Sequence, residues 1–138
     1  MKIVPRVRVE APVHPTESAA KVKLACLNLF PDLAFIQEGD VLVGETTSLE
    51  RFRTQVRHQR IRDTARGILI RNRQGSETHF RLNKQAAYMG LVNFGTGAAL
   101  GDLAVTVAEE NMDALIDHVA ESTVGRRLTG TRDRTEGT

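Results

Sequence analysis

The chain has 138 residues, of which 41% are hydrophobic, and it carries 19 Lys and Arg against 17 Asp and Glu. This length is typical of one globular domain, and a chain of this size buries roughly 68 to 70% of its unfolded surface without disulfides or metal. The single cysteine, Cys26, excludes an internal disulfide and favours a reducing, cytoplasmic environment. No apolar run reaches the roughly 18 to 20 residues of a membrane span, and no apolar signal stretch opens the chain, so we expect neither membrane insertion nor secretion.

The first third of the chain predicts a strand, a helix and a hairpin. Residues 3–11 alternate between apolar and charged side chains, the period of a strand with one solvent-facing side. Thr16 can cap a helix that ends at Pro31. Two short apolar runs, 33–36 and 41–43, then predict a β-hairpin. The predicted buried stripe of the helix comprises Ala20, Val22, Leu24, Cys26, Leu27, Leu29 and Phe30.

The centre of the chain predicts two helices, or one helix with a bend. Residues 47–50 have the capping-box pattern, with a threonine as N-cap and a glutamate three positions later. Apolar residues then recur every three or four positions up to Val56, but the next step, to Ile61, is five residues long. This step breaks the helical register, so we place a bend or a break at residues 58–60.

The last third predicts a turn at 74–76, a strand at 78–82, a helical turn at 83–88, an apolar run at 90–94 and a strand at 103–108. Asn111 can cap a final helix. The element order is therefore strand, helix, hairpin, two helices, three strands and helix. We expect a single α+β domain at residues 1–124, followed by a flexible polar tail at 125–138 that shows no apolar periodicity.

The basic residues are concentrated in the middle of the chain. Residues 51–84 contain ten basic and two acidic side chains, a net charge of +8, whereas the remainder has nine basic and 15 acidic, a net charge of −6. Arginine suits bidentate phosphate recognition, although a solvated helix face that pairs with the acidic flanks of the same molecule would give the same pattern. The candidate phosphate-contacting side chains are Arg53, Arg57, Arg60, Arg62, Arg66, Arg73, Arg81 and Lys84.

No motif predicts catalysis, a metal or a cofactor. The four histidines and Cys26 lack ligand spacing. The glycine-rich segment 95–101 reads GxGxxxG and leads into a strand, unlike a dinucleotide fingerprint or a P-loop. We therefore expect a non-enzymatic protein without catalytic residues, metal or cofactor. With only 4% aromatic residues, the composition favours phosphate contacts on structured RNA over base stacking on single strands.

Five segments follow one another along the chain: 39–45 (GDVLVGE), 82–87 (LNKQAA), 92–95 (VNFG), 100–103 (LGDL) and 113–117 (DALID). In this order they resemble an uncharacterised archaeal protein family, family 0201. The resemblance implies an α+β fold similar to the large-subunit ribosomal protein that contacts 5S RNA, with a mostly antiparallel sheet of about five to six strands and helices packed on one face. It also implies a role in RNA binding. It adds Asn83, Lys84 and Gln85 as candidate contacts, unless Asn83 and Gln85 cap backbone groups at the strand end.

Three functional hypotheses follow from the sequence. The first is a cytoplasmic RNA-binding domain that contacts phosphates of structured RNA through its arginine-rich helical region. The second is a homodimer or larger assembly, without a nucleic-acid ligand, in which the basic middle of one copy docks on the acidic flank of another. The third is a small enzyme acting on a phosphorylated metabolite, for which the sequence spacing shows no pocket.

Overall fold

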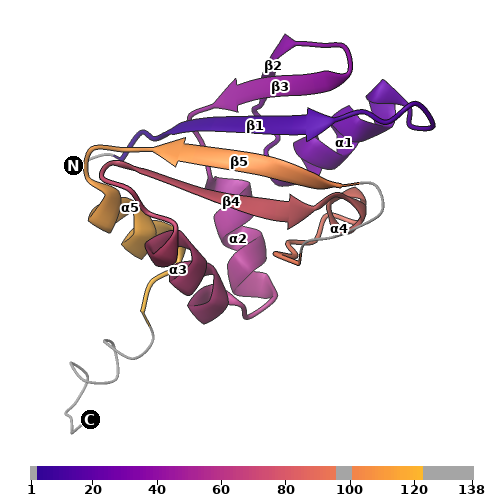
Figure 1. Ribbon diagram of the computed structural model, residues 1–138. Coiled ribbons are helices and arrows are strands. Elements are labelled where there is room, and N and C mark those ends of the chain that lie inside the picture. Colours follow the sequence, from indigo (N-terminus) through magenta and orange to yellow (C-terminus); the bar gives the residue numbers. More distant parts are fainter. Residues whose placement is uncertain (1–2, 96–100, 123–138) are drawn as a thin grey trace, which may run out of the picture.

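A computed structural model describes residues 3–95 and 101–122 of the chain. In chain order, the elements are β1 (Arg6–Pro12), α1 (Ala19–Leu29), β2 (Ala34–Gln37), β3 (Val41–Thr46), α2 (Glu50–His58), α3 (Arg62–Arg71), β4 (Glu77–Asn83), α4 (Lys84–Tyr88), β5 (Asp102–Ala108) and α5 (Met112–Val119). The strands lie in the order β2-β3-β1-β5-β4, and each neighbouring pair is antiparallel. Figure 1 shows this sheet with its helices. The predicted α+β class, with an antiparallel sheet of about five strands, is confirmed.

One face of the sheet is covered by the helices and forms the core. Alternate residues along β1, β4 and β5 are buried on this face, including Val9, Phe80 and Val105. Phe52 of α2 stacks on Phe80, with ring centroids 5.1 Å apart, and on Phe30 at 6.0 Å. This aromatic contact ties α2 to the sheet and to the end of α1, and so fixes where the basic helices sit.

The other face of the sheet carries no helix among the described residues. On this open face, the side chains of β1 and β4 are mostly charged and exposed, whereas those of β5 are short. Register places Arg8 beside Glu45 on one side and beside Thr106 on the other. The alternation expected for a strand with one solvent-facing side is therefore present along β1.

Two predicted helix starts are wrong, each by two residues. Ser18, not Thr16, is the N-cap of α1, and Leu24 on that helix is 55% exposed instead of buried. The capping box at 47–50 does not form, because Leu49 is buried and becomes the N-cap of α2. The Ser48 hydroxyl accepts the backbone N–H of Glu50 instead. At α2, the burial of Leu49 therefore moved the helix start past the position that local capping chemistry would have set.

The apolar run at 90–94 is not a strand. Its backbone is held by side chains: Gln59 donates to the Val92 carbonyl and accepts the Val92 N–H, both at 2.8 Å. The Asn93 carbonyl accepts the N–H of Asn83 at the end of β4. Val92 is buried, so the apolar pattern was correct about burial but not about conformation.

The predicted polar tail at 125–138 and residues 96–100 of the glycine-rich segment lie outside the described residues. The boundary at residue 124 stays a prediction. Within the described part of the chain, no helix is long and apolar enough to cross a membrane.

Candidate nucleic-acid interface

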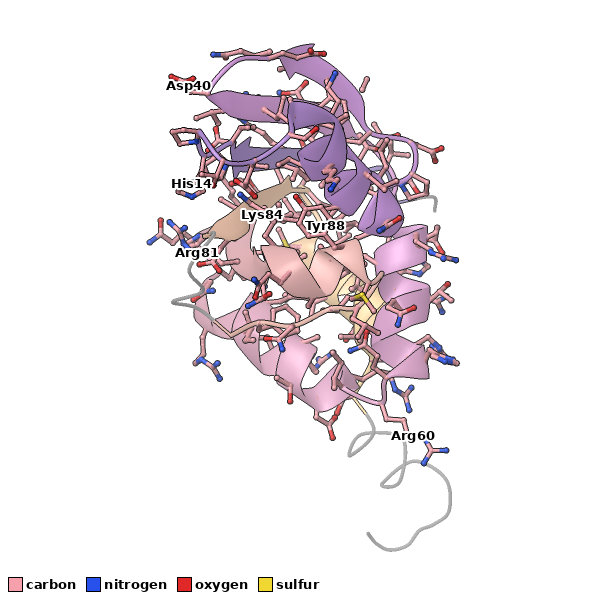
Figure 2. All side chains as sticks on the ribbon, turned by 90° about the vertical axis from the view of Figure 1, so that its right-hand side faces the viewer. His14, Asp40, Arg60, Arg81, Lys84 and Tyr88 are labelled. Carbon is pink, nitrogen blue, oxygen red and sulfur yellow. The ribbon has the colours of Figure 1, made fainter. Side chains whose placement is uncertain are left out.

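Helices α2 and α3 meet at a sharp corner centred on Arg60, which confirms the predicted break. The Arg60 N–H donates to the carbonyl of Arg57 and the Ile61 N–H donates to that of Val56, both at 3.1 Å. These two bonds form a Schellman motif, which ends helices with a left-handed residue. Arg60 has a φ of 59°, a conformation that glycine usually occupies at such a position. The motif directs the chain outward, and Figure 2 shows Arg60 projecting from the end of the molecule.

Three arginines line an open cleft at this corner. Arg57, Arg60 and Arg62, with Asp63, surround a depression of about 390 Å³. The side chains of Arg57 and Arg62 are 41% and 25% exposed. Guanidinium groups present planar sets of N–H donors that match the oxygens of a phosphate, so the cleft can hold a phosphate group at its mouth. We call these residues the arginine corner.

One carboxylate already binds two guanidiniums of the arginine corner. Glu121 accepts from Nη1 of Arg57 and from Nη1 of Arg62 through the same oxygen, Oε1, at 2.8 Å in both cases. A single negative charge between two positive charges leaves an excess of positive charge. The bond from Arg57 is exposed and the bond from Arg62 is partly buried. Solvent reaches both and weakens ion pairs, so an incoming phosphate can exchange with the carboxylate.

Three further arginines that the sequence singled out, Arg53 on α2, Arg66 on α3 and Arg73 just after α3, bind α5 or its C-terminal end. Arg66 donates to Asp117 at 2.7 Å and to the Ala120 carbonyl at 3.0 Å. Arg73 pairs with Asp113, and Arg53 donates to the His118 carbonyl at 2.7 Å. Pairing between the basic region and an acidic flank of the same molecule is therefore present. Together with the two contacts to Glu121, these bonds form an arginine–acid seam between α2, α3 and the end of the described chain.

The other predicted contacts are separate from the corner. Arg81 is exposed on the open sheet face, and Figure 2 shows it away from Arg60. Asn83 caps α4, because its side chain accepts the Ala86 N–H at 2.9 Å, as one reading of the sequence expected. Gln85 is exposed. The structure does not bring these residues together with the arginine corner.

The expectation that Lys84 contacts a phosphate is corrected by its burial. The side chain is 0% exposed, and its ammonium donates to the Pro12 carbonyl at 2.6 Å and to Glu17 at 3.0 Å. A buried ammonium with a counter-ion of its own holds two chain segments together and has no access to a polyanion. Figure 2 shows Lys84 inside the molecule, beside Tyr88.

Burial and charge around Lys84 shift three titratable groups. Burial opposes the ionisation of Glu17, but the His14 N–H and the Lys84 ammonium outweigh it and hold the pKa of Glu17 below its ordinary value. Burial raises the pKa of Tyr88, and nearby Glu17 and Cys26 add to this effect. Burial also raises the pKa of Cys26 to about 12, so its thiol is protonated at neutral pH. Among residues 3–95 and 101–122, no three His, Cys, Asp or Glu side chains are grouped as metal ligands.

Sequence reasoning missed the acidic partners of the arginines. Asp113, Asp117 and Glu121 recur every four residues, which places them along one side of α5 and its continuation. Arg62 and Arg66 are also four residues apart, so the two rows are visible in the sequence, but their pairing depends on how α5 packs. Nothing local identified Glu17 as the partner of Lys84, because 67 residues separate them.

A family model described as RNA binding matches residues 6–109 of the chain. A UPF0201 protein of Thermococcus onnurineus is 42% identical over 124 residues, which cover 85% of this chain and 92% of that protein. A UPF0201 protein of Methanothermobacter thermautotrophicus is 40% identical over 119 residues, or 83% and 90% of the two chains. The crystal structure of a UPF0201 protein from Methanococcus jannaschii superimposes with a TM-score of 0.79 and 37% identity, over 87% of this chain and 96% of that one.

Proposed function

The chain belongs to the UPF0201 family of archaeal proteins, and from this membership, together with the matching RNA-binding family model, we propose that it binds structured RNA at the arginine corner. The observation that carries the proposal is the open cleft in which Arg57, Arg60 and Arg62 face one another. Two of these side chains are tied to a surface carboxylate and the third is exposed. The corner thus offers several N–H donors to one phosphate.

Binding requires little rearrangement of the backbone. Arg60 stands at the mouth of the cleft because the Schellman motif fixes its position. Arg57 and Arg62 need only turn from Glu121 toward a phosphate oxygen, which replaces one anionic acceptor by another. The arginine–acid seam holds α2 and α3 beside α5 during this exchange, because Arg66 and Arg53 keep their contacts with α5.

The side chains around the corner favour backbone contacts over base stacking. Phe30, Phe52 and Phe80 are buried in the core, and Phe94 is partly buried against it. Single-strand binders usually present exposed aromatic platforms for bases, whereas double-helical RNA is recognised mainly through its shape, phosphates and 2′-hydroxyls. The arginine corner fits the second mode.

The second hypothesis from the sequence, docking of one copy's basic region on another copy's acidic flank, has less support. The groups that it would use are already paired within one molecule, as in Arg66 with Asp117 and Arg73 with Asp113. Docking through them would have to break these intramolecular pairs first.

The proposal is tested by measuring the affinity for a structured RNA hairpin as a function of salt. The test variant is Arg60→Gly with Arg62→Gln, which removes two charges from the corner. Each phosphate contact adds about 0.7 to 0.9 to the slope of log K against log salt. We expect the double variant to bind at least about tenfold more weakly at low salt and to lose between about one and two units of slope.

The matched control is Lys21→Gln with Lys23→Gln on α1, which removes the same charge from another part of the surface. It should leave the affinity within about twofold of the wild type, because charges distant from the corner are screened and Lys23 is already paired with Glu38. Absence of binding by the wild type at low salt, or an equal loss in both variants, would contradict a specific arginine corner.

A further inference from the structure

The open face of the sheet has a floor of short side chains between two charged walls. Along β5, Ala104, Thr106 and Ala108 point to this face, and their burial is intermediate. Both neighbouring strands place longer side chains beside them. A shallow depression of about 420 Å³ lies over the Ala108 end of this floor, between Arg6 and Glu77. The face is therefore hollowed over this end of β5.

The strand register places the walls opposite each other in three rows. In the first row Ala108 lies between Arg6 and Glu77. In the second row Thr106 lies between Arg8 and His79. In the third row Ala104 lies between Glu10 and Arg81. From the first row to the third, the β1 wall reads positive, positive, negative, and the β4 wall reads negative, histidine, positive.

This charge pattern is complementary to itself under one rotation. A two-fold axis parallel to β5 and above the face exchanges the β1 and β4 walls while keeping each row in place. Arg6 then meets Glu77 of the second copy, and Glu10 meets Arg81 of that copy. Symmetry repeats both contacts, which gives four ion pairs around a floor of small residues. A two-fold interface needs this kind of self-complementarity.

The second possible two-fold axis, in the plane of the face but across the strands, fits less well. It exchanges the first and third rows within each wall, so Arg6 would meet Glu10 of the second copy. However, the middle row would meet itself, and Arg8 would lie against Arg8 of the second copy. Like charges placed directly opposite are destabilising, which favours the axis along β5.

Several wall residues have no partner within one molecule. Among residues 3–95 and 101–122, the side chains of Arg6, Glu77 and Arg81 form no hydrogen bond or ion pair with one another or with other residues. This contrasts with Arg57, Arg62, Arg66 and Arg73, each of which is paired with an acidic residue of α5 or of the segment just after it. The two-fold axis along β5 brings Arg6, Glu77 and Arg81 to opposite charges. Its fourth contact residue, Glu10, already accepts from Arg8 at 3.1 Å within the molecule and would be shared with Arg81 of the second copy.

We propose that the open sheet face binds the same face of a second copy of this chain, about a two-fold axis parallel to β5. The proposal is independent of RNA binding, because the arginine corner lies on helices away from this face. Sheets packed face to face lie about 10 Å apart, a gap that arginine and glutamate side chains can span above a floor of alanine and threonine. Because the axis lies above β5, only β1, β5 and β4 of the two copies overlap, and a face of three strands is about 14 Å wide. This contact is small for a stable dimer, so the dimer should dissociate on dilution.

The test is sedimentation equilibrium over a wide range of protein concentration, at low and high salt. We expect a reversible monomer–dimer equilibrium that high salt weakens, because the contacts are exposed ion pairs. Glu77→Arg places like charges at two symmetry-related contacts and should raise the dimer dissociation constant about tenfold or more. The double variant Arg6→Glu with Glu77→Arg restores opposite charges only under the axis along β5, and should dimerise like the wild type.

The matched control is Glu110→Arg, at an exposed position outside the sheet, with the same change of net charge as Glu77→Arg. It should dimerise normally. A monomeric wild type at every concentration overturns the proposal, as does a dimer that Glu77→Arg leaves intact or that the double charge swap does not restore. A monomer whose RNA affinity falls with Arg6→Glu would assign the face to RNA instead, and would also overturn it.

Discussion

Lys84 and the arginine corner are both cationic, but they differ in solvent access and therefore in what they can do. The Lys84 ammonium is 0% exposed and is bound by Glu17 and the Pro12 carbonyl. Arg57 and Arg62 share one carboxylate at the surface and remain 41% and 25% exposed. A buried pair stabilises the fold and is costly to break, whereas a surface pair contributes little and exchanges readily. Positive charge alone does not identify a binding site.

The largest effect should come from breaking the buried pair. Glu17→Gln leaves the Lys84 ammonium buried without a counter-ion, which costs about 3 to 5 kcal/mol. Urea unfolding followed by circular dichroism measures this loss. The double variant Glu17→Gln with Lys84→Met removes both charges and should recover much of the stability. A loss below about 1 kcal/mol for Glu17→Gln would show that the pair behaves like a surface pair.

The buried pair also predicts how stability depends on pH. The pKa of Glu17 is lower in the folded chain than its ordinary value, so ionised Glu17 stabilises the fold. This contribution is complete above the ordinary pKa of a glutamate, about 4.3, and is lost as the pH falls through the lowered folded value. Urea unfolding from neutral pH to pH 3 should show the wild type and Glu17→Gln converging toward acid. A constant difference between them would contradict this assignment.

Removing the carboxylate that binds the arginine corner should moderately raise the affinity for RNA, whereas removing arginines from the corner lowers it. Glu121→Gln removes the carboxylate that holds Arg57 and Arg62, so both guanidiniums become available to phosphate. We expect RNA affinity to rise severalfold while the free energy of unfolding falls by no more than about 1 kcal/mol. Asp113→Asn, which releases Arg73 away from the corner, serves as the control. Equal affinity gains in both variants would indicate a general charge effect.

The smallest effect on stability should come from Arg60. A non-glycine residue at a φ of 59° is strained, so Arg60→Gly should change the free energy of unfolding by less than about 1 kcal/mol, with stabilisation as the expected sign. RNA affinity should nevertheless fall, because the exposed guanidinium is lost. Thermal unfolding and RNA titration of the same variant separate the two roles. Clear destabilisation would mean that Arg60 has a structural contact.

Sequence patterns predicted helices and strands correctly where the local sequence preference and the burial of the side chains favour the same conformation. The break before Ile61 was read from the step after Val56, and β1, β5 and the stripe of α5 followed from their apolar periodicity. Predictions failed where a distant group decided the local conformation. Residues 90–94 are not a strand because Gln59 satisfies the backbone of Val92.

The candidate site was predictable only in part, for the same reason. The density of arginine in residues 51–84 was visible in the sequence, and so was the four-residue spacing of the acids from Asp113 to Glu121. Which arginines face which acids depends on how α5 packs beside α2 and α3. From the sequence alone, Lys84 could not be distinguished from the neighbouring basic residues, because its burial depends on a contact with Glu17, which is 67 residues away along the chain.

The sequence by itself determined the α+β class, the antiparallel character of the sheet, the position of the basic region and the family. The α+β class and the basic region follow from periodicity and composition, which are local along the chain. The antiparallel sheet and the family follow from the resemblance of several segments to a known family. Only the tertiary structure decided which charges are buried, which are paired and which remain open to a ligand. That decision depends on contacts between distant segments, because the free energy of a charge is set by its solvation and its neighbours. The charged residues behind the net charge of +2 are therefore found in four settings: a buried ion pair, the arginine–acid seam, the arginine corner and the open sheet face.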